Sequence, residues 1–508
     1  MSLSIAIDQS VRGFFSGTLI SRLTGVVRDI SMAAFFGADP SVAALFIALR
    51  LTSFVRRLLG EGGMQTAFVP QFEQIKAKSK EEAAYFFRDL MLFLALLLGP
   101  LVILTTLIFS YFSTSEVMHL TGVLFPGILF LTLYALNSSF LLCCYSTLSA
   151  SLAPMMLNII WIIAIFSFRE EPVEVAIVKI AWMLVFGYLC QWLFTLPKTV
   201  TSYRNLTSHF VKNIQLFSRQ NRRLFSSLIL SLIGVGATQV NSLVDVFFAR
   251  IADPSGPVYL FYALRIEQLP FALFGLASVN AVFPSLSAAV HAKRWGELNE
   301  VLQKCMQRLF ALLIPCTIAL LVLGEDVIQL LFCHVNFTLA DGFVTTKALF
   351  AYGLSLIPAI FVLLLSSLFY AQKNYRLPAL ISLAMVGVNV LLNSLCVFGF
   401  GFGAVSVAIA TAISSWINAS LLIVFLFKNM PEIEKVLPRE GGKVLFSSVL
   451  AGIFTLSFSI PLGLLFSFMI KCLLFTLVLL TSLRLLQAKE SERMIFNLFI
   501  PARYRADM

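Results

Sequence analysis

Five arginines lie between residues 22 and 57 of a chain whose surrounding sequence is strongly apolar: Arg22, Arg28, Arg50, Arg56 and Arg57. A guanidinium at the centre of a bilayer costs about 2.5–3.5 kcal/mol even on lenient insertion scales. Guanidinium groups bind phosphate through two parallel hydrogen bonds and stay charged at any physiological pH. The cluster therefore predicts a water-filled cavity that receives an anion, and a diphosphate fits it better than a single carboxylate.

The composition is that of a polytopic membrane protein. Of 508 residues, 59% are hydrophobic and 12% are charged, whereas soluble domains are about 45–50% apolar and about 25% charged. The net charge of +11 does not indicate nucleic-acid binding, because the basic residues form short clusters between apolar segments. Such clusters are typical of cytoplasmic loops. The sequence has no P-loop, GxSxG or HExxH motif and its eight cysteines lack metal-ligand spacing, so we expect neither an enzyme nor a bound metal cofactor.

The apolar segments predict an all-α fold with fourteen transmembrane helices. A helix needs about 20 apolar residues to cross the hydrocarbon core. The segments lie near residues 10–36, 41–59, 84–110, 120–148, 152–168, 176–197, 223–250, 257–289, 305–323, 344–370, 377–399, 403–427, 443–460 and 463–486. With the N-terminus inside, 27 of the 37 Lys and Arg residues fall in inside loops and 4 in outside loops. The positive-inside rule thus predicts a multi-pass membrane protein with both termini in the cytoplasm.

An internal repeat predicts two lobes of six helices each. The segment GADPSVAALFIALRL at 37–51 recurs as IADPSGPVYLFYALRI at 251–266, and AFVP at 67–70 recurs as AVFP at 281–284. Both copies connect an odd-numbered helix to the next helix through an outside turn, so the repeat is parallel, as in two-lobed transporters. The predicted parts are an N-terminal lobe (1–200), a connector (201–222), a C-terminal lobe (223–428), two extra helices (443–487) and a cytoplasmic tail (488–508). The repeat aligns Arg50 with Arg265, which adds an arginine from the second lobe.

The alternative interpretation of the arginines is that acids neutralise them. Asp29 is adjacent to Arg28, Glu61 is near Arg56 and Arg57, and Glu267 is near Arg265. An excess of positive charge remains after these pairings. We therefore predict anion binding for Arg22, Arg28, Arg56 and Arg265, with Asp29, Arg50, Glu61 and Glu267 as supporting residues of the cavity.

A second group of polar residues also falls at membrane depth. Asp245 lies in the seventh segment, and Asn389 and Asn393 lie four residues apart in the eleventh, on one helical face. An acid with amides can coordinate a cation or relay protons, or it can join helices by hydrogen bonds. Both interpretations stay open, and Lys471, in the middle of the last segment, has no assigned role.

Several motifs resemble those of one family. They are SRLTGVVRD (21–29), FGADP (36–40), FVRRLLGEGGMQTAFVP (54–70) and the pair YALRIEQLP (262–270) and FPSLS (283–287). They resemble the MurJ (MviN) family of the MOP exporter superfamily, the bacterial lipid II flippases. The resemblance implies movement of undecaprenyl-diphosphate-linked peptidoglycan precursor to the outer leaflet by alternating access. It matches the cavity arginines of the family to Arg22, Arg28, Arg56 and Arg265, and it gives the last two helices a groove for the lipid tail.

The chain departs from the family pattern at several positions. Thr52 replaces a common proline, Leu264 replaces an aspartate, and Gln268 stands where the family has an acid, with Glu267 displaced by one residue. Some members bind sodium between helices 7 and 11, where Asp245 and Asn389 match and Asn393 replaces an acid. We expect lipid II and membrane lipids as partners, a monomer that can join a cell-wall synthesis complex, and coupling to Na⁺, H⁺ or the membrane potential. The alternatives are another MOP-type polysaccharide-lipid flippase, a multidrug antiporter, or a non-transporting scaffold.

Overall fold

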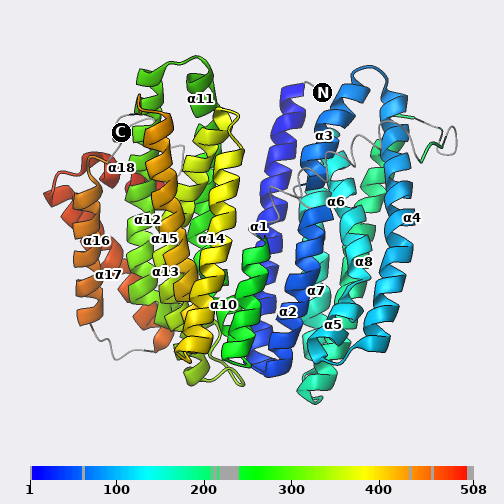
Figure 1. Cartoon of the computed structure of the whole chain (residues 1–508), viewed down its shortest axis with the longest axis horizontal. Helices are drawn as coiled ribbons and strands as arrows, with labels where there is room; N and C mark the ends of the chain where they lie inside the picture. The colour runs from blue at the N-terminus through cyan, green and yellow to red at the C-terminus, as the bar shows by residue number, and fades with distance from the viewer. Residues whose placement is uncertain are drawn as a thin grey trace. The chain divides into compact units, whose positions relative to one another are not determined.

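The computed structural model describes residues 3–59, 63–207, 209, 214–216, 239–433, 438–458 and 463–499. All regular structure in these ranges is helical (Figure 1), as the apolar pattern predicts. The chain forms two compact units, Met1–Leu243 with Val335–Phe337, and Val244–His334 with Thr338–Met508. The predicted lobe boundaries stay predictions, because residues 217–238 lie outside the described ranges.

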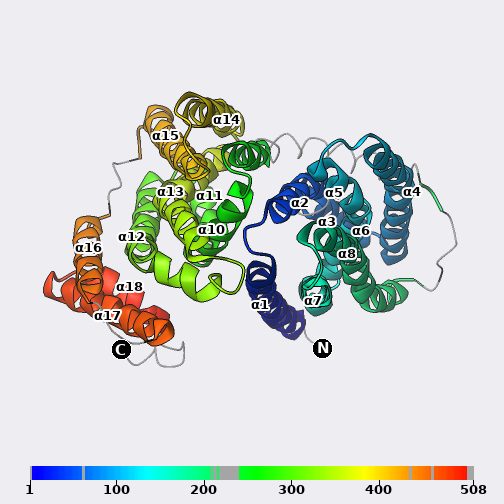
Figure 2. The same ribbon diagram turned by 90° about the horizontal axis from the view of Figure 1, so that it is seen from below.

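The first unit is built from the helices before residue 205. They are α1 (Leu3–Phe36), α2 (Pro40–Leu59), α3 (Gly63–Lys76), α4 (Lys80–Phe112), α5 (Glu116–Leu124), α6 (Gly127–Cys143), α7 (Leu148–Phe168) and α8 (Val173–Arg204). Within this unit α1 packs along α7, and α8 contacts α5, α6 and α7, as Figure 2 shows end-on. Its core is aromatic: the rings of Phe87 and Phe140 stack with centroids 4.1 Å apart, and Phe68 stacks on Phe72 and Phe86.

The second unit begins with a helix whose described part covers residues 239–252. It continues with α10 (Gly256–Pro270), the π-helix η1 (Phe271–Leu276), α11 (Ala277–His291), α12 (Trp295–Leu331), α13 (Leu339–Ala371), α14 (Arg376–Ser394), the π-helix η2 (Leu395–Gly399), α15 (Val405–Asn429), α16 (Gly441–Ser457), α17 (Leu464–Leu485) and α18 (Lys489–Phe499). Helix α13 is central, since it contacts α10, α11, α12, α14 and α15.

Each of the fourteen predicted segments coincides with a helix in the described ranges, the seventh through residues 239–252. By length and apolarity nine of these helices can cross a membrane, or ten when the bent pair α5–α6 counts as one span. The protein is therefore a multi-pass membrane protein. Two boundaries differ from the prediction: residues 63–76, expected in an inside loop, form α3, and the single helix expected over 120–148 bends by 41°. Pro126 at that bend has no backbone N–H to donate to the preceding turn.

The repeat is visible in the local structure of both units. Asp39 Oδ1 accepts a hydrogen bond from the Ser41 amide at 2.7 Å, and Asp253 Oδ1 accepts one from the Ser255 amide at 2.8 Å. The Asp-Pro-Ser sequence therefore makes the same turn before α2 and before α10. The order of helices also corresponds, with α4 matching α12, α7 matching α14, and α8 matching α15. This correspondence confirms the two pseudo-symmetric lobes that the repeat predicts.

The three C-terminal helices are attached to α12 by polar contacts near both of its ends. Near one end, Lys471 Nζ on α17 donates to both carboxylate oxygens of Asp326, at 3.1 and 2.8 Å. Near the other end, the buried Gln307 donates to Ser491 Oγ at 2.8 Å and to Glu440 Oε2 at 3.3 Å. Glu440 Oε2 also accepts from the Ser491 amide in the first turn of α18. Lys471 thus has a structural partner that its sequence position did not indicate.

The π-helix η1 packs tightly on α13 at Gly275. A Cβ atom added to Gly275 would overlap the Cγ1 and Cδ1 atoms of Ile360, which is fully buried on α13. Gly275 therefore permits the close approach of these two segments, and no larger residue fits without a shift of the α13 side chain.

We expect Gly275→Ala to lower the free energy of unfolding by about 1–3 kcal/mol, because overpacking a filled core forces side chains out of their preferred rotamers. Thermal unfolding in detergent measures the change. Gly387→Ala is the matched control, since no atom lies within 4 Å of its added Cβ. The control should gain about 0.5–1 kcal/mol from the better helix propensity of alanine. Equal effects of the two substitutions would contradict the tight packing of η1.

Candidate functional site

Arg28 lies between α1 and α7 and is only 7% exposed. Its Nε and Nη2 donate to Asp29 Oδ1 at 2.9 and 2.6 Å, and its Nη1 donates to Asn158 Oδ1 at 2.8 Å. The guanidinium also lies over the Trp161 ring, 4.4 Å from its centroid. Asp29 thus neutralises the charge of Arg28, as the alternative interpretation of the sequence expects. The pair is held on α7 through the contacts of Arg28.

Asn158 connects this ion pair to the backbone of α1. Its Nδ2 donates to the Ser21 carbonyl at 3.0 Å and to Thr24 Oγ1 at 3.1 Å, while its Oδ1 accepts from Arg28. A single buried amide therefore satisfies groups on two successive turns of α1. Neither Asn158 nor Trp161 was identified from the sequence, since their role depends on a contact across about 130 residues.

Arg22 differs from Arg28 although both lie on α1. Six residues rotate a side chain by about 120° around a helix, so Arg22 lies on the exposed side, beside Leu19, Leu23 and Val26. In the described part of the chain it makes no hydrogen bond or ion pair. Among the described residues Arg22 therefore has no counter-charge, and it lies on a largely apolar side of a helix that the sequence predicts to span the membrane.

The remaining predicted residues are distributed over both units. Arg50 is partly buried on α2, and Arg265 is partly buried on α10, with its guanidinium 4.6 Å from the centroid of the Phe261 ring. Glu267 is buried on α10 and forms no ion pair with Arg265, because residues two apart on a helix do not face each other. The side chains of Arg56 and Arg57, and the whole of Glu61, lie outside the described residues.

The second predicted group does come together, within the second unit. Asp245 Oδ1 accepts from Asn393 Nδ2 and its Oδ2 accepts from Thr411 Oγ1, both at 3.0 Å. Asn393 Nδ2 also donates to Asn389 Oδ1 at 2.7 Å, and Asn389 donates to Thr411. The predicted residues thus form one buried network, which Thr411 on α15 joins. One buried acceptor in it, Asn393 Oδ1, has no hydrogen-bond partner.

A second Arg-Asp dipeptide forms a buried pair on α4, near the start of the third predicted segment. Arg88, 1% exposed on α4, donates from Nε and Nη2 to Asp89 Oδ1 at 2.9 and 2.7 Å. Asp89 Oδ2 accepts from the Gln215 amide at 3.0 Å. The pair therefore fastens the segment after α8 to α4, and its signal in the sequence was an Arg-Asp dipeptide next to an apolar run, as at residues 28–29.

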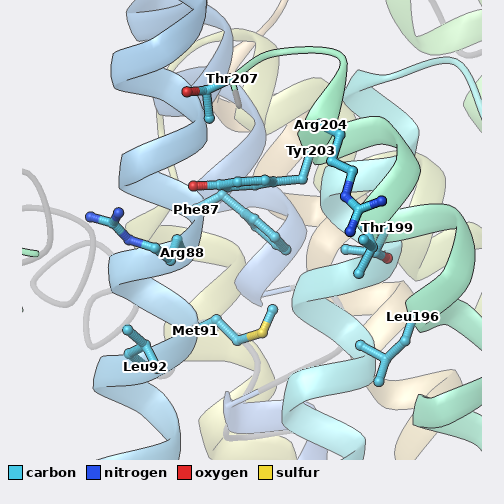
Figure 3. A pocket seen from close by; sticks show the side chains of 10 residues that line it. Phe87, Arg88, Met91, Leu92, Leu196, Thr199, Tyr203, Arg204 and Thr207 are labelled. Carbon is cyan, nitrogen blue, oxygen red and sulfur yellow. The ribbon is translucent and has the colours of Figure 1, made fainter. Parts of the chain in front are cut away.

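A cavity of about 350 Å³ lies beside this pair, between α4 and α8. Figure 3 shows the Tyr203 side chain crossing the space between these helices. The cavity is lined by Phe87, Arg88, Met91, Leu92, Leu196, Thr199, Val200, Tyr203, Arg204 and Thr207. It is mainly apolar and includes none of the predicted site residues, so it is separate from the arginine site.

Comparison with known proteins identifies the family. The family model described as lipid II flippase MurJ matches residues 32–483. The chain belongs to the MurJ family. A probable lipid II flippase MurJ from Chlamydia muridarum is 33% identical over 464 residues, which cover 89% of this chain and 85% of that protein. A MurJ relative from Vibrio cholerae, also named a probable lipid II flippase, is 27% identical and covers 80% of each chain.

Solved structures agree with the MurJ fold. A lipid II flippase MurJ in an inward closed conformation gives a TM-score of 0.75 at 24% identity, covering 94% of this chain and 99% of the other. An inward-facing multidrug resistance MATE family transporter of the MOP superfamily gives 0.65 at 16% identity, covering 82% and 96%. The MurJ chain therefore has the fold of MOP superfamily transporters.

We expect Asn158→Ala to destabilise the first unit by about 1–3 kcal/mol, since it leaves buried polar groups of α1 unsatisfied. Thermal unfolding in detergent measures this loss. The control is Asn429→Ala, whose exposed amide bonds only to the Phe425 carbonyl of its own helix, and it should change stability by less than about 0.5 kcal/mol. An unchanged melting temperature for Asn158→Ala would show that the pair does not fix α1 on α7.

Proposed function

We propose that this protein is a lipid II flippase of the bacterial cytoplasmic membrane, with both termini in the cytoplasm. It would move the diphosphate-linked sugar-peptide head from the inner to the outer leaflet by alternating access, while the lipid tail stays in the bilayer. Membership of the MurJ family supports the substrate class. The observation that carries the proposal within this chain is Arg22, an exposed guanidinium at membrane depth without a protein counter-charge in the described residues.

The arginines have different roles in the proposed binding of the diphosphate. Arg22 can give two parallel hydrogen bonds to phosphate oxygens without breaking any bond within the protein. Arg28 would first have to leave Asp29 and Asn158, so we assign it to the positioning of α1 on α7. Arg265, which is partly buried on α10, stays a predicted contact, and so does Arg56.

Other functions fit this arrangement less well. A multidrug antiporter with cationic substrates shares the fold, yet the uncompensated charge of Arg22 would repel such substrates. A polysaccharide-lipid flippase would use the same diphosphate contacts, and the family supports lipid II instead. A scaffold that does not transport would gain nothing from a free guanidinium in lipid, whose burial is costly.

We expect Arg22→Ala to weaken lipid II binding roughly 10- to 100-fold, since charge-assisted hydrogen bonds contribute about 1.5–3 kcal/mol. Arg22→Lys should bind lipid II with an affinity between those of the wild type and Arg22→Ala. An ammonium is a point charge and lacks the planar fork of donors that a guanidinium has. Titration of purified protein with lipid II in detergent measures the affinity, with Arg169→Ala, an exposed arginine on the connection between α7 and α8, as control. Wild-type affinity in Arg22→Ala would exclude the diphosphate contact.

We further propose that the Asp245 network binds a monovalent cation such as Na⁺. Its donors are oxygens of one carboxylate, two amides and a hydroxyl, the type that hard cations prefer. The residues that would hold the ion are Asp245, Asn389, Asn393 and Thr411, and the partnerless Asn393 Oδ1 fits such a role. A bound cation would supply positive charge beside Asp245 and join three helices of the second unit.

If the network binds Na⁺, the ion should stabilise the folded protein by about 1.4 kcal/mol at ten times its dissociation constant. Thermal unfolding with NaCl and with N-methyl-D-glucamine chloride at equal ionic strength separates binding from screening. Asp245→Asn should remove the sodium-specific difference while the protein still folds. No difference between the two salts in the wild type would leave the network as a set of hydrogen bonds that join the helices.

A further inference from the structure

Glu267 is a carboxyl group inside a membrane-spanning helix without any protein partner in the described residues. It lies on α10 and is 7% exposed, and it makes no hydrogen bond or ion pair there. An ionised carboxylate in such a place has lost its hydration and gained nothing in return, which strongly disfavours the charged form. Such a place favours a neutral carboxylic acid with a bound proton over the carboxylate.

The described residues around Glu267 offer no counter-charge. Helix α10 packs against η1, α12, α13 and α15. Arg265 is the nearest cation along α10, and it lies on another face of the helix. The titratable and charged side chains of the packing elements are Glu297, Glu300, Lys304, Cys305, Arg308, Cys316, Glu325 and Asp326 on α12, Asp341, Lys347, Tyr352 and Tyr370 on α13, and Lys428 on α15. The preceding helix, whose Ala249 contacts Gly256 of α10, adds Asp245, which is bound by Asn393 and Thr411, and Arg250, which donates to the Pro254 carbonyl.

None of these groups neutralises Glu267. On α13, the central segment from Ala348 to Ala371 contains no acid, lysine, arginine or histidine. Asp341, in the first turn of α13, is bound by the Tyr259 hydroxyl and by Thr338, and Lys347 is exposed. The two acids nearest the outer end of α12 are occupied as well, Asp326 by Lys471 and Glu325 by Gln329.

The position of Glu267 in its helix links it to a conformational element. It lies in the last turn of α10, immediately before the π-helix η1, and its carbonyl oxygen accepts from the Phe271 amide at the junction. π-Helical segments mark sites where helices bend and are frequent at functional positions. A change in helix pitch at η1 would rotate the end of α10 and carry Glu267 from the interior of the unit toward water. The neighbouring Gln268 is exposed already.

We propose that Glu267 carries a proton through the transport cycle. This inference rests on the transport function proposed above and names its coupling ion. The carboxyl takes a proton from water on the outer side, forming one O–H bond, and keeps it while α10 packs on α13. When the helix rearranges at η1, the proton returns to water on the inner side and the carboxylate becomes solvated. The head group moves outward in exchange, so an inside-negative potential favours the cycle.

The first test detects the proton itself and does not depend on transport. Infrared spectra of the purified protein near neutral pH should contain a carbonyl band of a protonated carboxylic acid that is absent from Glu267→Gln. Glu267→Asp should retain a shifted band. A spectrum in which Glu267→Gln removes no such band would overturn the proposal, whatever the protein transports.

The second test measures coupling in vesicles that contain the full chain and a fluorescent lipid II, with the electrical potential clamped by potassium and valinomycin. For one proton per cycle, the ratio of outer to inner lipid should change about tenfold per unit of pH gradient. Glu267→Gln, which mimics the neutral acid, should lose this response. The double variant Glu267→Gln with Gln268→Glu, which moves the acid to the exposed neighbouring position, should not restore it.

The outcomes separate the two proposals. A pH response that persists in Glu267→Gln, or a wild type that flips lipid without any pH response, would overturn proton carriage by Glu267 and leave the flippase intact. A wild type that binds no lipid II and flips none would overturn the proposed function, while the infrared band would still decide whether Glu267 holds a proton.

Discussion

The ion pair between Arg28 and Asp29 is the interaction on which the first unit depends. A charge inside lipid must be neutralised, hydrated or removed, and here two adjacent residues of α1 neutralise each other. Asn158 and Trp161 of α7 both contact the Arg28 guanidinium and so connect the pair to that helix. The pair at Arg88 and Asp89 solves the same problem on α4 by recruiting the segment after α8. Among the described charges of α1, Arg22 is the one without a protein partner, and a substrate can supply it.

The sequence predicts the fold well because lipid imposes a simple rule on long segments. Every segment of about 20 apolar residues becomes a helix, and the distribution of Lys and Arg predicts its direction. The repeat was equally readable, since an Asp-Pro-Ser turn depends on three consecutive residues and local hydrogen bonds. The errors fall where local sequence is ambiguous: α3 is less apolar than a span, and the bend at Pro126 lies within a continuous apolar run.

The candidate site was only partly predictable, because the sequence of one helix does not show which of its sides faces the neighbouring helix. The sequence identified Arg22 and Arg28 as a pair, but their different environments depend on which side of α1 meets α7, a fact encoded more than 120 residues later. The same limit applies to Glu267, which was expected beside Arg265 and instead lies on another face of α10. Asp245, Asn389 and Asn393 were grouped correctly, because two residues four apart share a face and point to one neighbour. Thr411 was missed, since a single threonine in an apolar helix carries no signal by itself.

The attachment of the C-terminal helices has a mechanical consequence. Because α17 is held to Asp326 near one end of α12, and α18 is held through Glu440 and Ser491 to Gln307 near the other, the three helices cannot pivot about a single point. The three helices therefore move with α12 as one body when α12 tilts. A long isoprenoid chain that rests against these helices would therefore move sideways together with the second unit. It would not have to leave the helices while the head group crosses the membrane.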